Sequence, residues 1–211
     1  MGRFDAVIFD MDGTLVDTLA MTVGAVKKYA PQCGLIPVTR EALLKAIGLC
    51  NHDFYLALYP EASDEQREEI EELVEEGELE IGRTLGEGIL FPGVVQMLHR
   101  LHDAGVRLML ASTGTERHVR GSLSIAGILP LFEKIGCGAA DKTEMTAELL
   151  SGLDPARVVF VGDGAKDIQA ARNNGLAVYG AGFGYADGDA FDEVFDAPEA
   201  LTKALLRDSA E

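Results

Sequence analysis

Basic residues are scarce in this sequence. Of its 211 residues, 18 are Lys or Arg and 35 are Asp or Glu, which gives a formal net charge of −17. A protein that binds nucleic acid through its phosphates needs a patch of basic side chains, and so does one that binds an anionic membrane surface. The composition therefore argues against nucleic-acid and membrane partners.

Cysteines and long apolar runs are also few. Cys33, Cys50 and Cys137 are widely spaced and form no CxxC pair, so the sequence supports neither a disulfide framework nor a zinc site. Asp5 and Asp10 bracket a run of only four apolar residues near the start, and nowhere do the about 18 consecutive apolar residues of a membrane span occur. We therefore expect a cytoplasmic protein.

The pattern of the remaining chain predicts an α/β fold. Hydrophobic residues make up 47% of the sequence, as in an ordinary globular protein of one or two domains. Short apolar runs predict buried parallel strands at residues 4–9, 106–111, 158–161 and 177–179. Helical patterns lie between them at residues 94–104, 116–126 and 165–174. This alternation indicates a doubly wound parallel sheet, in which ligands bind beyond the carboxyl ends of the strands.

Residues 16–87 interrupt the alternation and show helical spacing throughout. Ser63 and Gln66 form a capping-box pattern, after which apolar residues recur on one helix face. Residues 61–80 hold eleven acidic residues and one base, Arg67, which we interpret as a solvent-exposed helix face. We expect an all-helical insertion at 16–87, and a catalytic core made of residues 1–15 and 88–211.

The first polar cluster, Asp10-Met11-Asp12-Gly13-Thr14-Leu15, follows the first predicted strand. Two carboxylates two residues apart can both face one site at the sheet edge, one as a nucleophile and the other as a proton donor. Gly13 permits a sharp turn that presents amide hydrogens to an anion. The alternative is a solvated loop whose acids cap a helix.

Two further clusters follow the second and third predicted strands. Ser112 and Thr113 offer hydroxyl groups to a phosphate, just before a helix whose first amides would add to them. Asp163 and Asp167 could join Asp10 as oxygen ligands of Mg²⁺. Helix capping is the alternative for each cluster, because Ser, Thr and Asp are all common at helix starts.

Lys142 lies between these two clusters, at the start of a predicted helix. A lysine opposite several carboxylates could hold a phosphoryl group that is being transferred. For a single lysine, a surface position is the plain alternative. The place of Lys142 in the order of the clusters favours the functional interpretation.

The order and spacing of these segments resemble the haloacid dehalogenase superfamily, within it the phosphatases with a helical cap after the first motif, and among these the phosphoglycolate-phosphatase-like members. The resemblance rests on DMDGTL at 10–15 and VGDGAKD at 161–167, and it covers the whole chain. It implies a Rossmann-like core and a Mg²⁺-dependent phosphatase of small phosphorylated metabolites. Asp12 argues against dehalogenation, because a leaving alkoxide needs a proton donor and a leaving halide does not.

The resemblance also implies roles for individual residues. Asp10 would form an aspartyl-phosphate, and Asp12 would serve as general acid and base. Ser112 and Lys142 would bind the phosphoryl oxygens. Asp10, the backbone carbonyl of Asp12, and Asp163 would hold Mg²⁺, with Asp167 binding the ion directly or supporting it from behind.

The inserted segment offers candidates for substrate choice. Residues 47–52 combine a glycine with polar side chains, so we expect Asn51 or His52 to contact the leaving group; a plain helix–helix turn is the alternative. Two rival functions remain open, a phosphomutase acting on a sugar phosphate and a noncatalytic phosphate-binding module. The sequence names neither the substrate nor the oligomeric state.

Overall fold

The computed structural model describes residues 3–186, 188 and 190–206, and leaves the side chain of residue 51 outside the description. Within these residues, six parallel strands form one sheet in the order β3-β2-β1-β4-β5-β6. The strands are β1 (Ala6–Phe9), β2 (Arg107–Ala111), β3 (Phe132–Gly136), β4 (Val158–Gly162), β5 (Ala177–Ala181) and β6 (Glu193–Phe195). The predicted doubly wound sheet is confirmed.

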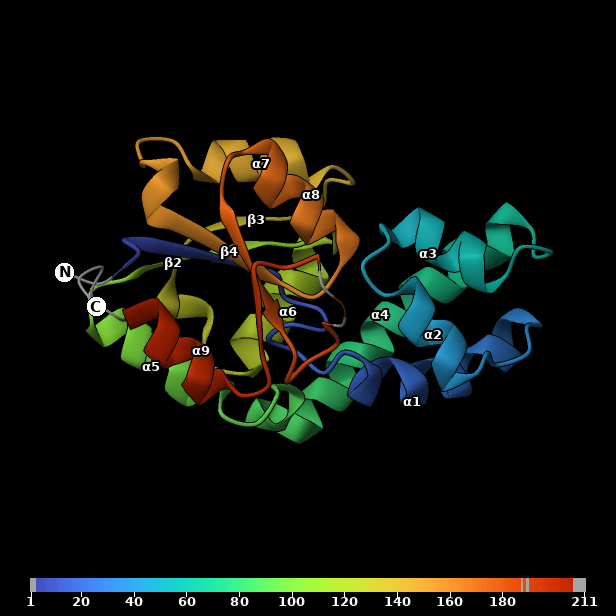
Figure 1. Ribbon diagram of the computed structural model, residues 1–211. Coiled ribbons are helices and arrows are strands. Elements are labelled where there is room, and N and C mark those ends of the chain that lie inside the picture. Colours follow the sequence, from blue (N-terminus) through green and yellow to red (C-terminus); the bar gives the residue numbers. More distant parts are fainter. Residues whose placement is uncertain (1–2, 187, 189, 207–211) are drawn as a thin grey trace.

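Helices cover both faces of this sheet (Figure 1). Those of the core are α5 (Val94–Asp103), α6 (Glu116–Ile125), α7 (Lys142–Leu149), α8 (Ala165–Asn173) and α9 (Pro198–Leu206). Alternate strand residues point to opposite faces, so Val7 and Phe9 join one apolar cluster with α5, α6 and α9. Ala6 and Ile8 join the other, with α7 and α8. Both faces are therefore buried, as in other parallel sheets.

Two strands, β3 and β6, were not predicted from the sequence, and both lie at the edges of the sheet. β3 carries Glu133 and Lys134 in its middle, and β6 has only three residues, of which Glu193 and Val194 are exposed. Edge strands have one unpaired side and are commonly short and charged, so they lack the apolar run by which central strands are predicted.

A helical segment lies between β1 and α5. Its helices are α1 (Leu19–Tyr29), α2 (Arg40–Ala46), α3 (Asn51–Leu58) and α4 (Asp64–Leu85). We call this segment the cap. It has an apolar core of its own, with Ile70 and Val74 of α4 buried against α1. The expected all-helical insertion is confirmed, whereas the domain boundaries at 16 and 87 stay a prediction.

The start of α4 illustrates how the sequence sets the cap. The Ser63 hydroxyl accepts a hydrogen bond from the Gln66 N–H, and the Gln66 side chain accepts one from the Ser63 N–H, which completes the predicted capping box. The two segments that connect the cap to the core lie side by side, since the Asp17 N–H donates to the Ile89 carbonyl at 2.9 Å. The capping box sets where α4 begins, and the paired connecting segments set where the cap joins the core.

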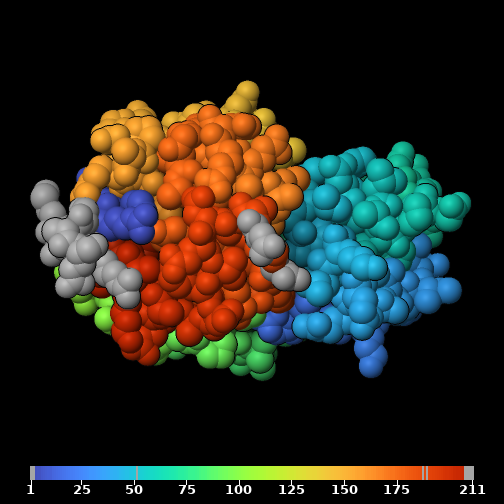
Figure 2. All heavy atoms as spheres, in the orientation of Figure 1, coloured from blue at the N-terminus to red at the C-terminus, as the bar shows by residue number. Residues whose placement is uncertain are grey.

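The cap lies against one side of the core (Figure 2). The Thr113 hydroxyl donates to the Leu49 carbonyl at 3.4 Å, and the Thr115 hydroxyl donates to Glu75 of α4 at 2.8 Å. Among the helices of the described residues, none combines the length and the apolar composition needed to cross a membrane.

Candidate active site

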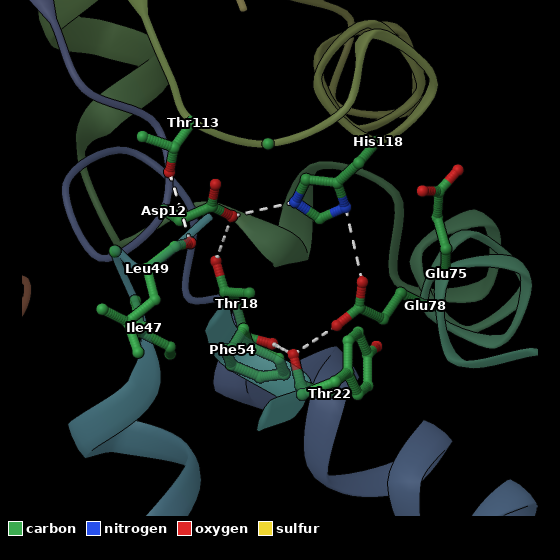
Figure 3. A pocket seen from close by; sticks show the side chains of 13 residues that line it. Asp12, Thr18, Thr22, Ile47, Leu49, Phe54, Glu75, Glu78, Thr113 and His118 are labelled. Carbon is green, nitrogen blue, oxygen red and sulfur yellow. Dashed lines mark hydrogen bonds and ion pairs between the residues drawn. The ribbon is translucent and has the colours of Figure 1, made fainter. Parts of the chain in front are cut away.

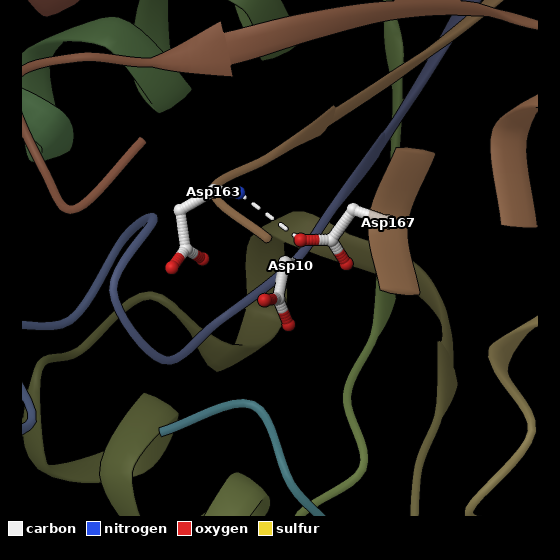
Figure 4. A group of neighbouring side chains, drawn as sticks. All are labelled: Asp10, Asp163 and Asp167. Atoms are coloured by element: carbon white, nitrogen blue, oxygen red, sulfur yellow. Dashed lines mark hydrogen bonds between the residues drawn. The ribbon is translucent and has the colours of Figure 1, made fainter. Parts of the chain in front are cut away.

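The neighbouring strands β1 and β4 bring two carboxylates together. Phe9 pairs with Val161, and the Asp10 N–H donates to the Val161 carbonyl at 2.9 Å. Asp10 therefore leaves β1 at the level where the loop after β4 begins, and Asp163 follows in that loop (Figure 4). The strand order of the sheet reverses between β1 and β4. Ligands of doubly wound sheets bind beside the point of this reversal.

Lys142 is buried between two of the predicted acids. Its Nζ lies 2.7 Å from Oδ1 of Asp10 and 2.7 Å from Oδ1 of Asp167, and all three side chains are buried. Burial alone would lower the pKa of the lysine ammonium, but the two carboxylates outweigh burial and raise that pKa above its usual range. The ammonium is therefore a permanent positive charge at the centre of the site.

Both carboxylate oxygens of Asp167 have hydrogen-bond partners. While Oδ1 faces Lys142, Oδ2 accepts hydrogen bonds from the N–H groups of Asp163 and Gly164, at 3.0 and 2.9 Å. Gly162 makes room for it, because a Cβ on Gly162 would lie 2.4 Å from the Asp167 carboxyl carbon. Asp167 thus links the lysine to the loop that carries Asp163.

The acids suit a divalent cation. Asp10, Asp163 and Asp167 each place one carboxylate oxygen within 4.8 Å of the others. Three carboxylates lie around one lysine, those of Asp10 and Asp167 buried and that of Asp163 partly buried, so negative charge is in excess. Burial and then Asp167 raise the pKa of Asp163 to about 7, and the same two causes raise the pKa of Asp10 well above its usual value. An oxygen-binding cation would neutralise that excess.

Asp12 faces away from this cluster. Its Oδ1 accepts from the Thr18 hydroxyl at 2.7 Å and lies 2.9 Å from Nε2 of His118 (Figure 3). The Ser112 hydroxyl lies 3.4 Å from Oδ2. Burial would raise the pKa of the Asp12 carboxyl, but His118 and Thr18 outweigh burial and lower it. The side chain is no part of the acid cluster, and the predicted metal contact of the Asp12 carbonyl stays a prediction.

His118 joins the core to the cap. Its Nδ1 lies 3.4 Å from Glu78 of α4, whose other carboxylate oxygen accepts from the Thr22 hydroxyl. Burial would lower the pKa of the imidazole, but Asp12 and then Glu78 outweigh burial and raise it well above its usual value. Glu78, His118 and Asp12 therefore form a buried chain of alternating charge from the cap to the sheet edge.

His118 and Glu78 were not among the residues predicted from the sequence. The acids of 61–80 were interpreted as a solvent-exposed helix face. That interpretation is wrong for Glu78, which is 8% exposed, and for Glu75, whose side chain is 13% exposed. One signal was present: His118 lies in the first turn of the helix that follows the Ser112 cluster.

The predicted phosphate-binding residues lie around the same edge. Ser112 is buried, and its hydroxyl accepts from the Gly114 N–H at 3.1 Å. Thr113 reaches the cap loop through the Leu49 carbonyl. Gly13 has a positive φ of +82°, and its carbonyl accepts from the Tyr185 N–H at 2.9 Å.

The predicted cap residues are less closely involved. His52 is exposed and lies outside the set of residues that line the cavity beside Asp12. Asn51 begins α3, and its side chain lies outside the described part of the chain. Ile47, Gly48 and Leu49 of the preceding loop line that cavity instead.

Comparison with known proteins identifies the family of this chain. Residues 7–181 match the family model of haloacid dehalogenase-like hydrolases. A phosphoglycolate phosphatase of Agrobacterium fabrum is 33% identical, over 94% of this chain and 91% of its own, and one of Synechococcus elongatus is 26% identical, over 96% and 97%. The chain belongs to the haloacid dehalogenase-like hydrolase family.

A solved structure shows the same fold. The crystal structure of a predicted phosphoglycolate phosphatase from Haemophilus somnus 129pt superposes with a TM-score of 0.84, covering 96% of this chain and 98% of that one, at 24% sequence identity. At this identity the likeness speaks for the architecture of sheet and cap alone.

Gly13 offers a test of how tightly the site is built. In Gly13→Ala, the new Cβ would lie 2.6 Å from Oδ2 of Asp163 and 2.5 Å from Cδ2 of Tyr185, and the residue would keep a left-handed φ. We expect a larger loss of unfolding free energy than in Gly105→Ala, where φ is +80° and nothing lies within 4 Å of the Cβ. The control should cost about 1–2 kcal/mol, the price of that φ for an L-residue. Equal losses in urea denaturation would contradict the close packing.

Proposed function

We propose that this protein is a Mg²⁺-dependent phosphatase that hydrolyses small phosphate monoesters through an aspartyl-phosphate on Asp10. One observation carries the proposal: two carboxylates two residues apart face different partners. Asp10 faces Lys142 and the acid cluster, and Asp12 faces His118 and the cap. The membership of the family supports it, as do relatives named phosphoglycolate phosphatases.

Asp10 and Asp163 would hold the cation. Oδ1 of Asp10 accepts from the Met11 N–H and faces Lys142, and Oδ1 of Asp163 accepts from the Thr14 hydroxyl, which leaves the other oxygen of each carboxylate to turn toward an ion. Both oxygens of Asp167 are already engaged by Lys142 and by the N–H groups of Asp163 and Gly164. When bound, the cation would reduce the repulsion between a phosphate dianion and the acids and stabilise charge in the transition state. Lys142 and Ser112 would bind the phosphoryl oxygens. Asp167 would keep Lys142 in place.

In the first step, a carboxylate oxygen of Asp10 attacks phosphorus and the bond from phosphorus to the ester oxygen breaks. The leaving oxygen takes a proton from Asp12. In the second step, Asp12 accepts a proton from a water molecule as that water attacks the phosphorus of the aspartyl-phosphate, which releases phosphate and restores Asp10.

The first step needs a proton on Asp12, and His118 can supply it. The pKa of Asp12 is lowered, so its carboxyl is ionised in the resting protein, whereas the pKa of the neighbouring imidazole is raised. The pair thus holds one proton, at His118. A transfer across the 2.9 Å contact supplies Asp12 with the proton that the leaving oxygen needs.

Replacement of the nucleophile tests the mechanism. We expect Asp10→Asn to reduce phosphate release below detection, because an amide cannot form the acyl phosphate, and to keep the fold, because it removes a buried charge. Acid quenching of the unchanged enzyme during turnover should trap a phosphoryl group on the peptide that contains Asp10. Substantial activity in Asp10→Asn would refute the mechanism. Isomerisation of a sugar phosphate without phosphate release would favour a mutase, and no reaction with any substrate and metal would favour a binding module.

Thermal unfolding tests the metal site without reference to activity. The folded pKa of Asp163 is about 7 against an ordinary 3.8, so between those values the folded state binds more protons than the unfolded state. Stability of the metal-free protein should fall as pH rises through this window. At a hundred times its Kd, Mg²⁺ should restore about 2.7 kcal/mol, seen as a rise in Tm at about pH 8 and much less at about pH 5.

Asp163→Asn should abolish this Mg²⁺-dependent rise in Tm, and Asp103→Asn at the exposed end of α5 should leave it intact. An unchanged rise in Asp163→Asn would contradict the assignment of Asp163 as a ligand.

His118 is a positioning and proton-supplying residue in this scheme. In His118→Gln, kcat for an alkyl phosphate should fall by about tenfold or more, because its leaving oxygen needs a proton, whereas p-nitrophenyl phosphate should lose much less. The exposed His102 of α5 provides the control variant His102→Gln. Equal losses for both substrates would indicate a purely structural role for His118.

A further inference from the structure

The chemistry of the substrate's leaving group can be inferred from the cavity beside Asp12. This cavity of about 80 Å³ lies between α4, the loop before α3 and the carboxyl edge of the sheet (Figure 3). Because Asp12 lines it, we place the leaving group, whose oxygen takes its proton from Asp12, in this cavity. At the roughly 15 Å³ that a water molecule needs on this scale, the cavity has room for a few heavy atoms.

The cavity is acidic. Asp12, Glu75 and Glu78 line it, and His118 is the sole positive group among the described lining residues, which include no Lys or Arg. His118 is already shared between Asp12 and Glu78.

Outside the cavity, Arg117 lies 3.6 Å from Glu75 but is 54% exposed, so water screens its charge. A net negative charge therefore remains where the leaving group sits.

The rest of the lining is neutral. Ile47, Leu49 and Phe54 form an apolar wall, and three threonines and Tyr55 supply hydroxyl groups. The hydroxyl groups of the threonines donate to partners of their own, Thr18 to Asp12, Thr22 to Glu78 and Thr113 to Leu49, so their remaining capacity is to accept hydrogen bonds. Together with the acids, the threonines thus favour a ligand that donates.

We propose that this cavity receives a leaving group that donates hydrogen bonds and carries no negative charge, an amine or a polyol, and that it disfavours a carboxylate. The inference rests on the phosphatase function proposed above. It separates this chain from the phosphoglycolate that its relatives' names suggest, since the glycolate carboxylate would lie among three acids.

Among the described residues that line the two cavities, Arg40 is the one lysine or arginine, and it could offer a carboxylate another position. It lines a second hollow between cap and core, together with Asp17, Asp163 and Tyr185. Asp12 lies outside that hollow, so a leaving group placed beside Arg40 would be separated from its proton donor.

Three substrates of equal chain length test the proposal. Phosphate release is measured for 2-aminoethyl phosphate, 2-hydroxyethyl phosphate and 2-phosphoglycolate, which end in a cationic, a neutral and an anionic group. With Mg²⁺ present, we expect kcat/KM for the first two to exceed that for phosphoglycolate by at least about tenfold, because like charges repel strongly in a partly buried site.

Glu75 provides the matched variant, since it lines the cavity and stands outside the Asp12–His118–Glu78 chain. Glu75→Gln should lower the preference for the amine over phosphoglycolate by about threefold or more. Glu76→Gln changes the next residue of the same helix, which lies outside the cavity lining, and should leave the preference unchanged. Thermal unfolding checks that both variants are folded.

The outcomes separate this proposal from the function on which it rests. A preference for phosphoglycolate would overturn the proposal without contradicting the phosphatase function. If Arg40→Gln then removed activity toward phosphoglycolate selectively, the carboxylate would be shown to bind beside Arg40. An equal change in the kcat/KM ratio of 2-aminoethyl phosphate to phosphoglycolate in Glu75→Gln and Glu76→Gln would also overturn the proposal. Release of no phosphate from these three substrates, from p-nitrophenyl phosphate or from any other phosphate monoester, with every metal tried, would contradict the phosphatase function, and this proposal with it.

Discussion

The clustering of three carboxylates around one lysine, two of them buried and the third partly buried, is the constraint on which the rest of this structure depends. Lys142 lies 2.7 Å from both Asp10 and Asp167, and Asp163 lies within the same cluster. Buried charges are costly unless they are paired, and one ammonium does not balance three carboxylates. The site therefore binds protons or a cation more strongly than an exposed set of acids would.

The fold provides this arrangement through backbone geometry. β1 and β4 lie side by side in parallel, so the loops after them meet at one edge of the sheet. The N–H groups of Asp163 and Gly164 hold Asp167, and Thr14 holds Asp163 at 2.9 Å. The acids are thus fixed before any ligand arrives, which is the preorganisation that phosphoryl transfer requires.

The part of the molecule that could be predicted from the sequence is the part in which short segments carry their own signal. The four central strands showed as apolar runs, and Asp10, Asp163 and Asp167 were placed together because their segments follow such strands. The strands β3 and β6 were missed because edge strands carry polar residues. Glu78 and His118 were missed for another reason: they meet across the cap–core boundary, 40 residues apart, and their pairing depends on where α4 crosses the sheet edge.

The contacts described above divide the acidic residues of the chain into groups with different surroundings. Most acids of α4 face solvent, as their sequence pattern indicates, but Glu78 is buried against His118 and Glu75 lines the cavity beside Asp12. The acidic group at the sheet edge would attract a cation, and the group on the cap would, in our proposal, disfavour a negatively charged leaving group. Asp12 lies between the two and takes its charge state from His118.

Proton release on metal binding tests the central constraint most directly. Mg²⁺ is titrated into chelator-treated protein by calorimetry at about pH 6, in two buffers of different ionisation enthalpy. Because the pKa of Asp163 is about 7 and that of Asp10 is also raised, the metal-free site carries protons at this pH that a cation must displace. We predict the release of about one proton or more per ion at pH 6, and clearly fewer at about pH 8.5. Binding with the same heat in both buffers at pH 6 would show that the carboxylates are ionised without a cation, and would contradict the account.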